Sequence, residues 1–118
     1  MMAPGPEADP LYLDQIIELT GLIKGSLSGV GEADFLANRD KADATALRLG
    51  AIGELSRKLS SELRGRHPNI DWQGMYRLRN IVAHHYDQLN YRRIWSIATN
   101  ALGDLQAACR AELDEIDG

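Results

Sequence analysis

Apolar residues recur at every third or fourth position along most of this sequence, and this spacing constrains the fold more than any other feature. The stripes predict long helices at about 10–28, 40–64, 71–84 and 91–116, and the segment 31–36 is expected to add a short helical turn. No alternating pattern typical of strands competes with them. The sequence therefore predicts an all-α fold, an antiparallel bundle of four main helices plus a short helical turn.

Local signals indicate where these helices begin and end. Asp71 and Asn90 are typical N-cap residues for the third and fourth long helices. The segment 65–68, Gly-Arg-His-Pro, is expected to end the second helix. The buried stripe of that second helix is expected to consist of Ala44, Leu47, Ala51, Ile52, Leu55, Leu59 and Leu63.

The length of 118 residues fits one domain. We expect residues 1–10, which are acidic and rich in proline, to form a disordered leader, and residues 11–118 to form a single helical domain. No apolar run approaches the roughly 20 residues of a membrane span. The single cysteine, Cys109, excludes an internal disulfide and is typical of a reducing compartment, so a cytoplasmic protein is expected.

Charge is unevenly distributed along the chain. The formal net charge of −4 argues against a protein that coats nucleic acid through bulk charge. Residues 57–93, however, carry eight basic and three acidic side chains, whereas the segments on either side are acidic. A basic middle of this kind suits a local site for an anion, although ordinary solvated helix faces would give the same count.

The segment 71–86 concentrates the polar side chains that can do chemistry. On an ideal helix Asn80 and His84 lie about 40° apart and one turn along, so Asn80 could hold the imidazole in one tautomer. Arg79 and His84 lie about 140° apart with a rise of about 7.5 Å, so they do not stack directly. A flexible arginine and a histidine at the helix end could still converge on one ligand.

Phosphodiester cleavage of RNA suits this set of side chains. An imidazole can accept the proton of a 2′-hydroxyl or return one to the leaving oxygen. A guanidinium can stabilise the charge that grows on the phosphate oxygens. No metal or other cofactor is required when the nucleophile belongs to the substrate.

Several motifs in order resemble those of the HepT-like HEPN toxins. The string Arg79-Asn80-Ile-Val-Ala-His84-His85-Tyr86 is similar to their R-x-x-x-x-H-x-Y motif. Residues 68–72 resemble the family's P-x-I-x-W segment, residues 52–54 its "IGE" element and residues 90–95 the start of its last helix. The chain departs from the pattern where residues 76–78 separate Met75 from Arg79, and where Leu55 replaces a common Ala.

The resemblance implies a HEPN-like helical domain and specific roles for its residues. Arg79 and His84 would be the ribonuclease pair, with Asn80 beside them. Tyr86 would be the target of AMP transfer by a partner nucleotidyltransferase, the antitoxin. The family also implies a homodimer in which two motifs face one cleft that takes the RNA substrate.

Two other functions compete with this interpretation. A metal hydrolase using His67, His84 and His85 is disfavoured, because adjacent histidines project about 100° apart on a helix. A non-catalytic HEPN module that binds a nucleotidyltransferase or a nucleotide is the stronger alternative, since fold does not imply function. The intact R-x-x-x-x-H pattern favours the enzyme.

Overall fold

The computed structural model describes residues 5–117, and all the regular secondary structure in that range is helical, as predicted. The elements in order are η1 (Pro6–Ala8), α1 (Asp9–Leu27), α2 (Glu32–Ala37), α3 (Arg39–Lys58), α4 (Ser61–Gly65), α5 (Trp72–His84), η2 (Tyr86–Gln88), α6 (Tyr91–Asn100) and α7 (Leu102–Asp117). None of the helices within this range combines the length and apolar character that crossing a bilayer requires.

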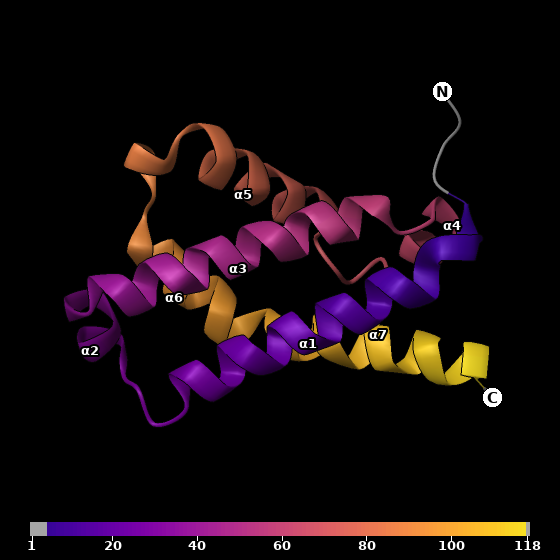
Figure 1. The fold of residues 1–118 in the computed structure, drawn as a ribbon, viewed down its shortest axis with the longest axis horizontal. Coiled ribbons are helices and arrows are strands. Elements are labelled where there is room, and N and C mark those ends of the chain that lie inside the picture. The colour runs from indigo at the N-terminus through magenta and orange to yellow at the C-terminus, as the bar shows by residue number, and fades with distance from the viewer. Residues whose placement is uncertain (1–4, 118) are drawn as a thin grey trace.

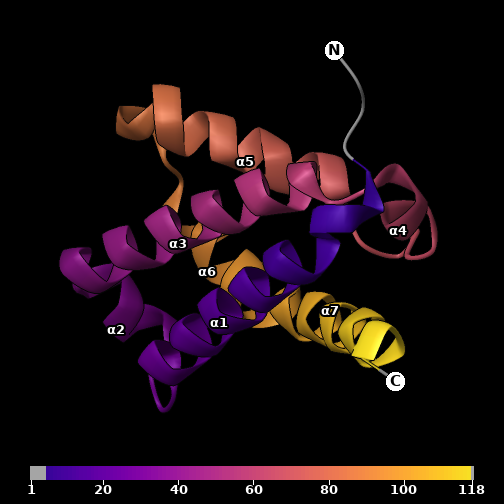
Figure 2. The ribbon, with the colours of Figure 1, turned by 45° about the vertical axis from the view of Figure 1, so that its right-hand side comes forward.

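Helix α3 lies at the centre of the bundle (Figure 1). It packs against α5 on one side and α1 on the other, and α7 packs along α1. Successive long helices run in opposite directions, and the turned view shows the same neighbours (Figure 2). The predicted all-α antiparallel bundle is confirmed, with the short helix α2 as the expected additional turn.

The expected helix at 40–64 is two helices, α3 and α4. The break between them is held by hydrogen bonds. The backbone N–H and the hydroxyl of Ser60 donate to the carboxylate of Asp9 at 2.8 and 2.6 Å, and both residues are buried. The Ser60 hydroxyl also caps α4 by accepting from the amide of Leu63. The second helix therefore breaks because a residue far away in sequence binds its backbone.

The same contact corrects the expectation for the amino terminus. Residues 1–10 were expected to form a disordered leader, but η1 and the start of α1 lie within this segment, and Asp9 is buried. Residues 1–4 fall outside the described range. An acidic composition suggested a solvated segment, but one of its carboxylates, that of Asp9, is buried in the core.

The expected helix at 91–116 is likewise divided at Ala101 into α6 and α7. Helix α6 packs against α2 and α3, whereas α7 packs against α1. One straight helix could not follow both surfaces. The predicted caps Asp71 and Asn90 are confirmed, because Asp71 accepts from the amide of Gly74 and Asn90 from those at 92 and 93.

The buried face of α3 differs from the predicted stripe. Ile52, Leu59 and Leu63 are buried as expected, but Leu47 is 65% exposed and Ala51 is also exposed. The helix instead buries smaller residues, and the full set is Ala42, Thr45, Ala46, Leu49, Gly50, Ile52, Gly53 and Ser56. A central helix needs small residues wherever a neighbour approaches closely, and hydrophobicity alone does not predict these positions.

Candidate active site

Glycines on α3 allow α5 to approach closely. A Cβ at Gly53 would collide with the backbone oxygen of Met75 and would lie 2.9 Å from the Cβ of Arg79. A Cβ at Gly50 would lie 3.1 Å from the side chain of Val82. The absent side chains therefore bring the backbone of α3 against the segment of α5 that carries the candidate residues.

Arg79 is held in place from both sides. Its Nε lies 2.8 Å from Oε2 of Glu54 on α3, and its Nη1 donates to Oδ1 of Asn80 at 3.0 Å. A hydrogen bond from Arg57, followed by the charges of Arg57 and Arg79, holds the pKa of the Glu54 carboxyl below its usual range. A carboxylate that sequence reasoning did not assign to the site therefore orients its arginine.

Asn80 binds a different residue from the one that the sequence predicts. The sequence placed it close enough to His84 to fix the tautomer of the imidazole. In residues 5–117, however, the Asn80 side chain bonds to Arg79, and no hydrogen bond joins it to His84. Asn80 is a partner of the arginine instead.

His84 is the last residue of α5 and is exposed to solvent. His85 follows as the C-cap with a non-helical backbone, φ −137° and ψ 42°. Within the described part of the chain, the hydrogen bonds and ion pairs that hold Arg79 do not include His84. One chain therefore presents an oriented arginine in the C-terminal half of α5 and an exposed histidine as the last residue of that helix.

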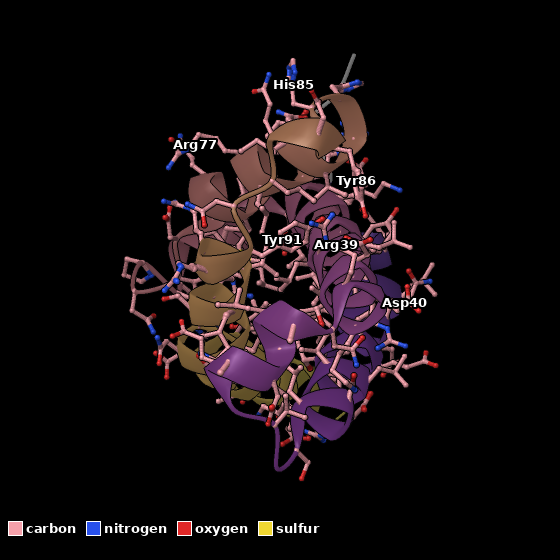
Figure 3. All side chains as sticks on the ribbon, turned by 90° about the vertical axis from the view of Figure 1, so that its left-hand side faces the viewer. Arg39, Asp40, Arg77, His85, Tyr86 and Tyr91 are labelled. Atoms are coloured by element: carbon pink, nitrogen blue, oxygen red, sulfur yellow. The ribbon has the colours of Figure 1, made fainter. Side chains whose placement is uncertain are left out.

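Tyr86 lies at the start of η2 and is 44% exposed. The carboxylate of Asp43 accepts from the Tyr91 hydroxyl at 2.5 Å and is the neighbour with the largest influence on the Tyr86 hydroxyl. The guanidinium of Arg39 lies 4.5 Å from the centre of the Tyr91 ring. Tyr86, Tyr91 and Arg39 gather at this end of the bundle, while Arg77 and His85 point away (Figure 3).

These contacts change the acidity of the two groups in opposite directions. Hydrogen bonds from Tyr91 and then from Tyr86 lower the pKa of Asp43. The bond to Asp43 is the largest cause of the raised pKa of Tyr86, with desolvation next. The resemblance gave Tyr86 a role, but no signal in the sequence indicated that the carboxylate of Asp43 would influence its hydroxyl.

The three histidines do not form a metal site. His67 lies in the loop before α5, with Nε2 2.7 Å from Oε2 of Glu112, whereas His84 and His85 lie at the far end of that helix. Across residues 5–117 no three histidine, cysteine or acidic side chains gather in a way that could hold a metal ion. The arrangement instead offers a guanidinium and an imidazole, a pair that suits acid–base and electrostatic chemistry on an anion.

Residues 12–112 match the family described as Ribonuclease HepT-like. The "Probable ribonuclease HepT" of Thermococcus cleftensis is 28% identical over 80% of this chain and 86% of its own length. A candidate RNase of Methanocaldococcus jannaschii is 30% identical over 73% of this chain and 79% of its own. A second candidate RNase of that organism is 36% identical over 57% of this chain, which spans 55% of its length. No solved structure matches the chain at a significant level.

Proposed function

This chain belongs to the HepT-like ribonuclease family, and we propose that it is a metal-independent endoribonuclease whose catalytic pair is Arg79 and His84. The observation that carries the proposal is the oriented Arg79. Glu54 and Asn80 hold its guanidinium in the C-terminal half of α5, the helix that ends at the exposed His84. A guanidinium fixed before substrate arrives stabilises growing negative charge without reorganising.

The reaction needs only guanidinium and imidazole side chains and the substrate. His84 accepts the proton of a 2′-hydroxyl, whose oxygen attacks the adjacent phosphorus. The bond from phosphorus to the 5′-oxygen breaks, and that oxygen takes a proton from an imidazolium. Arg79 stabilises the charge on the phosphate oxygens. The products are a 2′,3′-cyclic phosphate and a 5′-hydroxyl, and hydrolysis of the cycle leaves a 3′-phosphate.

A homodimer would supply the second imidazole that the leaving oxygen requires. An apolar groove beside the Glu54–Arg79 pair is bordered by the exposed Leu47 and Ala51 of α3 and by Val82 of α5. A neighbouring hollow that includes Leu22 extends this surface onto α1. A two-fold axis at this surface would face two α5 helix ends toward one RNA strand.

We place the enzyme in a cytoplasmic toxin–antitoxin pair, in which a nucleotidyltransferase antitoxin transfers AMP to Tyr86. The exposed ring of Tyr86 and its place two residues after His84 support this assignment. An added phosphodiester near the site would repel an incoming RNA phosphate. The modification would therefore inactivate the nuclease.

The decisive experiment measures cleavage of a labelled single-stranded RNA by purified protein in EDTA. We expect cleavage by the wild type, with 2′,3′-cyclic phosphate or 3′-phosphate ends. His84→Ala and Arg79→Ala should each lose about 10²- to 10⁴-fold in rate while remaining folded. His85→Ala is the matched control, because His85 is adjacent, exposed and outside the motif. Full activity in His84→Ala would reject the assignment, and a wild type without cleavage would favour the non-catalytic module.

A further inference from the structure

A cavity of about 500 Å³ lies between the end of α3, helix α4 and the first turns of α5. It extends along α5 to Asn80, the residue that binds Arg79. The cavity therefore opens beside the candidate active site and continues away from it along the helix.

The charged side chains that line this cavity are all arginines, namely Arg57, Arg64 and Arg77. Arg57 is engaged by Glu54 at 2.9 Å. Arg64 and Arg77 take part in none of the ion pairs found between described residues. Arg77 points outward on the side of α5 away from Tyr86 (Figure 3). The lining therefore suits an anionic ligand.

Two buried polar atoms at this cavity have no partner within residues 5–117. They are Oγ of Ser56, a residue only 1% exposed, and Nε of Arg64. A buried polar atom without a partner is costly, and native proteins keep few of them. Both residues line the cavity, but the two atoms lie beneath its surface, so a side-chain rotation would be needed for either to donate to a phosphate or ribose oxygen of a ligand. Their unmet hydrogen bonds favour a ligand with oxygen acceptors.

Two aromatic rings line the same cavity. The indole of Trp72 is fixed because its Nε1–H donates to the backbone oxygens of Arg64 and His67, at 3.1 and 3.0 Å. The ring of Tyr76 carries the guanidinium of Arg57 at 5.3 Å from its centre. Fixed aromatic and guanidinium planes are the groups on which single-stranded bases stack.

The geometry of α5 connects the cavity with the catalytic pair. Tyr76, Asn80 and His84 are spaced by four residues, so they follow one another along one face of the helix, each about 6 Å further on. We propose that the cavity is a nucleotide subsite, which binds the base and phosphate of a nucleotide flanking the scissile bond of single-stranded RNA. The inference rests on the proposed ribonuclease function and extends it to substrate recognition.

The test measures binding separately from cleavage. The probe is a short fluorescein-labelled single-stranded RNA with every 2′-hydroxyl methylated, so that it cannot be cut, and anisotropy gives its Kd. Tyr76→Ala should weaken binding about 5- to 150-fold, the loss typical of one stacked base. Arg77→Gln should lower the slope of log K against log salt by about 0.7, as expected for one lost phosphate contact to a single strand.

Arg93→Gln is the matched control, because Arg93 is exposed in the same basic segment but lies on α6, outside the cavity. It should leave the Kd and the salt slope unchanged. Unchanged binding in both Tyr76→Ala and Arg77→Gln would overturn the subsite. Free AMP that competes at concentrations near the Kd of the RNA would also overturn it, because the cavity would then hold a mononucleotide.

Occupancy can be followed directly by fluorescence. Trp72 is one of two tryptophans, so a Trp95→Phe variant leaves it as the sole reporter. Quenching of Trp72 by the methylated RNA supports the subsite, and its absence at saturating RNA contradicts it. Cleavage that depends on His84 but not on Tyr76 or Arg77 would reject the subsite and support the catalytic assignment. RNA binding that depends on Tyr76 and Arg77, without any cleavage, would support the subsite and reject the catalytic assignment.

Discussion

Nε of Arg79 lies 2.8 Å from Oε2 of Glu54, so a carboxylate of α3 orients the arginine of α5. Both side chains are partly buried, with 31% and 26% of their surface exposed, which limits screening by water. The pair joins the two helices whose close approach depends on Gly53. The family's sequence motif names the arginine, and the structure adds the residue that positions it.

Glu54→Gln should therefore change catalysis more than folding. We expect kcat for RNA cleavage to fall about 10- to 100-fold, because a displaced guanidinium no longer meets the transition state. RNA affinity should rise slightly, since a negative charge beside the site is removed. The opposite changes in kcat and affinity distinguish positioning from simple destabilisation. Glu62→Gln, on the exposed surface of α4, is the control and should change neither quantity.

Gly53→Ala should separate α3 from α5. The new Cβ would meet the Met75 backbone and the Arg79 side chain, so we expect a loss of about 1–3 kcal/mol in stability and reduced cleavage. Gly21→Ala is the contrasting variant, because its Cβ would meet nothing within 4 Å. Alanine is the better helix former, so Gly21→Ala should add up to about 1 kcal/mol. Equal melting temperatures for the two variants would contradict the close-packing argument.

Much of this architecture could be predicted from the sequence, because local rules govern it. Helical spacing identified the bundle, and the capping side chains at Asp71 and Asn90 formed the predicted bonds. What sequence reasoning missed depends on contacts between distant residues. Asp9 binds Ser60 across 51 positions and divides a helix that periodicity reads as continuous.

In the candidate site, too, local sequence predicts some features, and contacts between distant residues determine others. The R-x-x-x-x-H spacing could propose Arg79 and His84 as a pair, since both lie on one helix. Two carboxylates of α3 lie beside this region, Glu54 near Arg79 and Asp43 near Tyr86, and no spacing along α5 can reveal them. The hydrophobic pattern predicted that Leu47 is buried, but Leu47 is exposed in the single chain and borders the groove proposed for the dimer.

Leu47→Glu should disrupt the proposed homodimer. The side chain is 65% exposed in the single chain, so a charge there should change the stability of the monomer little. Inside an apolar interface the same charge would be buried without a partner, which would weaken the dimer. Light scattering at micromolar concentration should give a dimer for the wild type and about 13 kDa for the variant. Ile116→Glu, at the exposed end of α7, is the control and should remain dimeric. A monomeric wild type would contradict the proposed assembly.

Glu112 should make stability depend on pH. It accepts from Arg66 at 2.6 Å and contacts His67 at 2.7 Å, and chiefly the Arg66 hydrogen bond lowers the pKa of Glu112. A carboxyl with a lowered pKa in the folded state stabilises above its unfolded pKa of 4.5, and that contribution is lost as the pH falls further. Glu112→Gln should therefore cost about 1 kcal/mol near pH 7.

Thermal unfolding at several pH values checks this expectation. The gap in Tm between the wild type and Glu112→Gln should close as the pH falls well below 4.5. Glu115→Gln, an exposed residue on the same helix, controls for the change in net charge and should follow the wild type throughout. If the difference in Tm persists in acid, the effect of Glu112→Gln comes from packing and not from ionisation of Glu112.

Tyr86→Phe should keep nuclease activity and escape the antitoxin. The variant lacks the oxygen that would attack the α-phosphate of ATP, while the ring and the catalytic pair are retained. Asp43→Asn should slow modification of Tyr86, because the Asp43 carboxylate has the largest influence on the Tyr86 hydroxyl and could accept the proton released in the attack. Asp40→Asn, one turn away and exposed on α3, is the matched control.

Purified protein incubated with the nucleotidyltransferase and ATP should gain the mass of AMP and lose RNA cleavage together. Peptide mapping should place the group on Tyr86. Because AMP brings a negative charge, the modified side chain cannot stay beside the Asp43 carboxylate without repulsion. The Asp43 contact should therefore open, and the nucleotide should turn toward the helix end that carries His84. Mass gain mapped to Tyr91 or Tyr76 would reject the site, and inhibition without mass gain would indicate a complex that blocks the cleft.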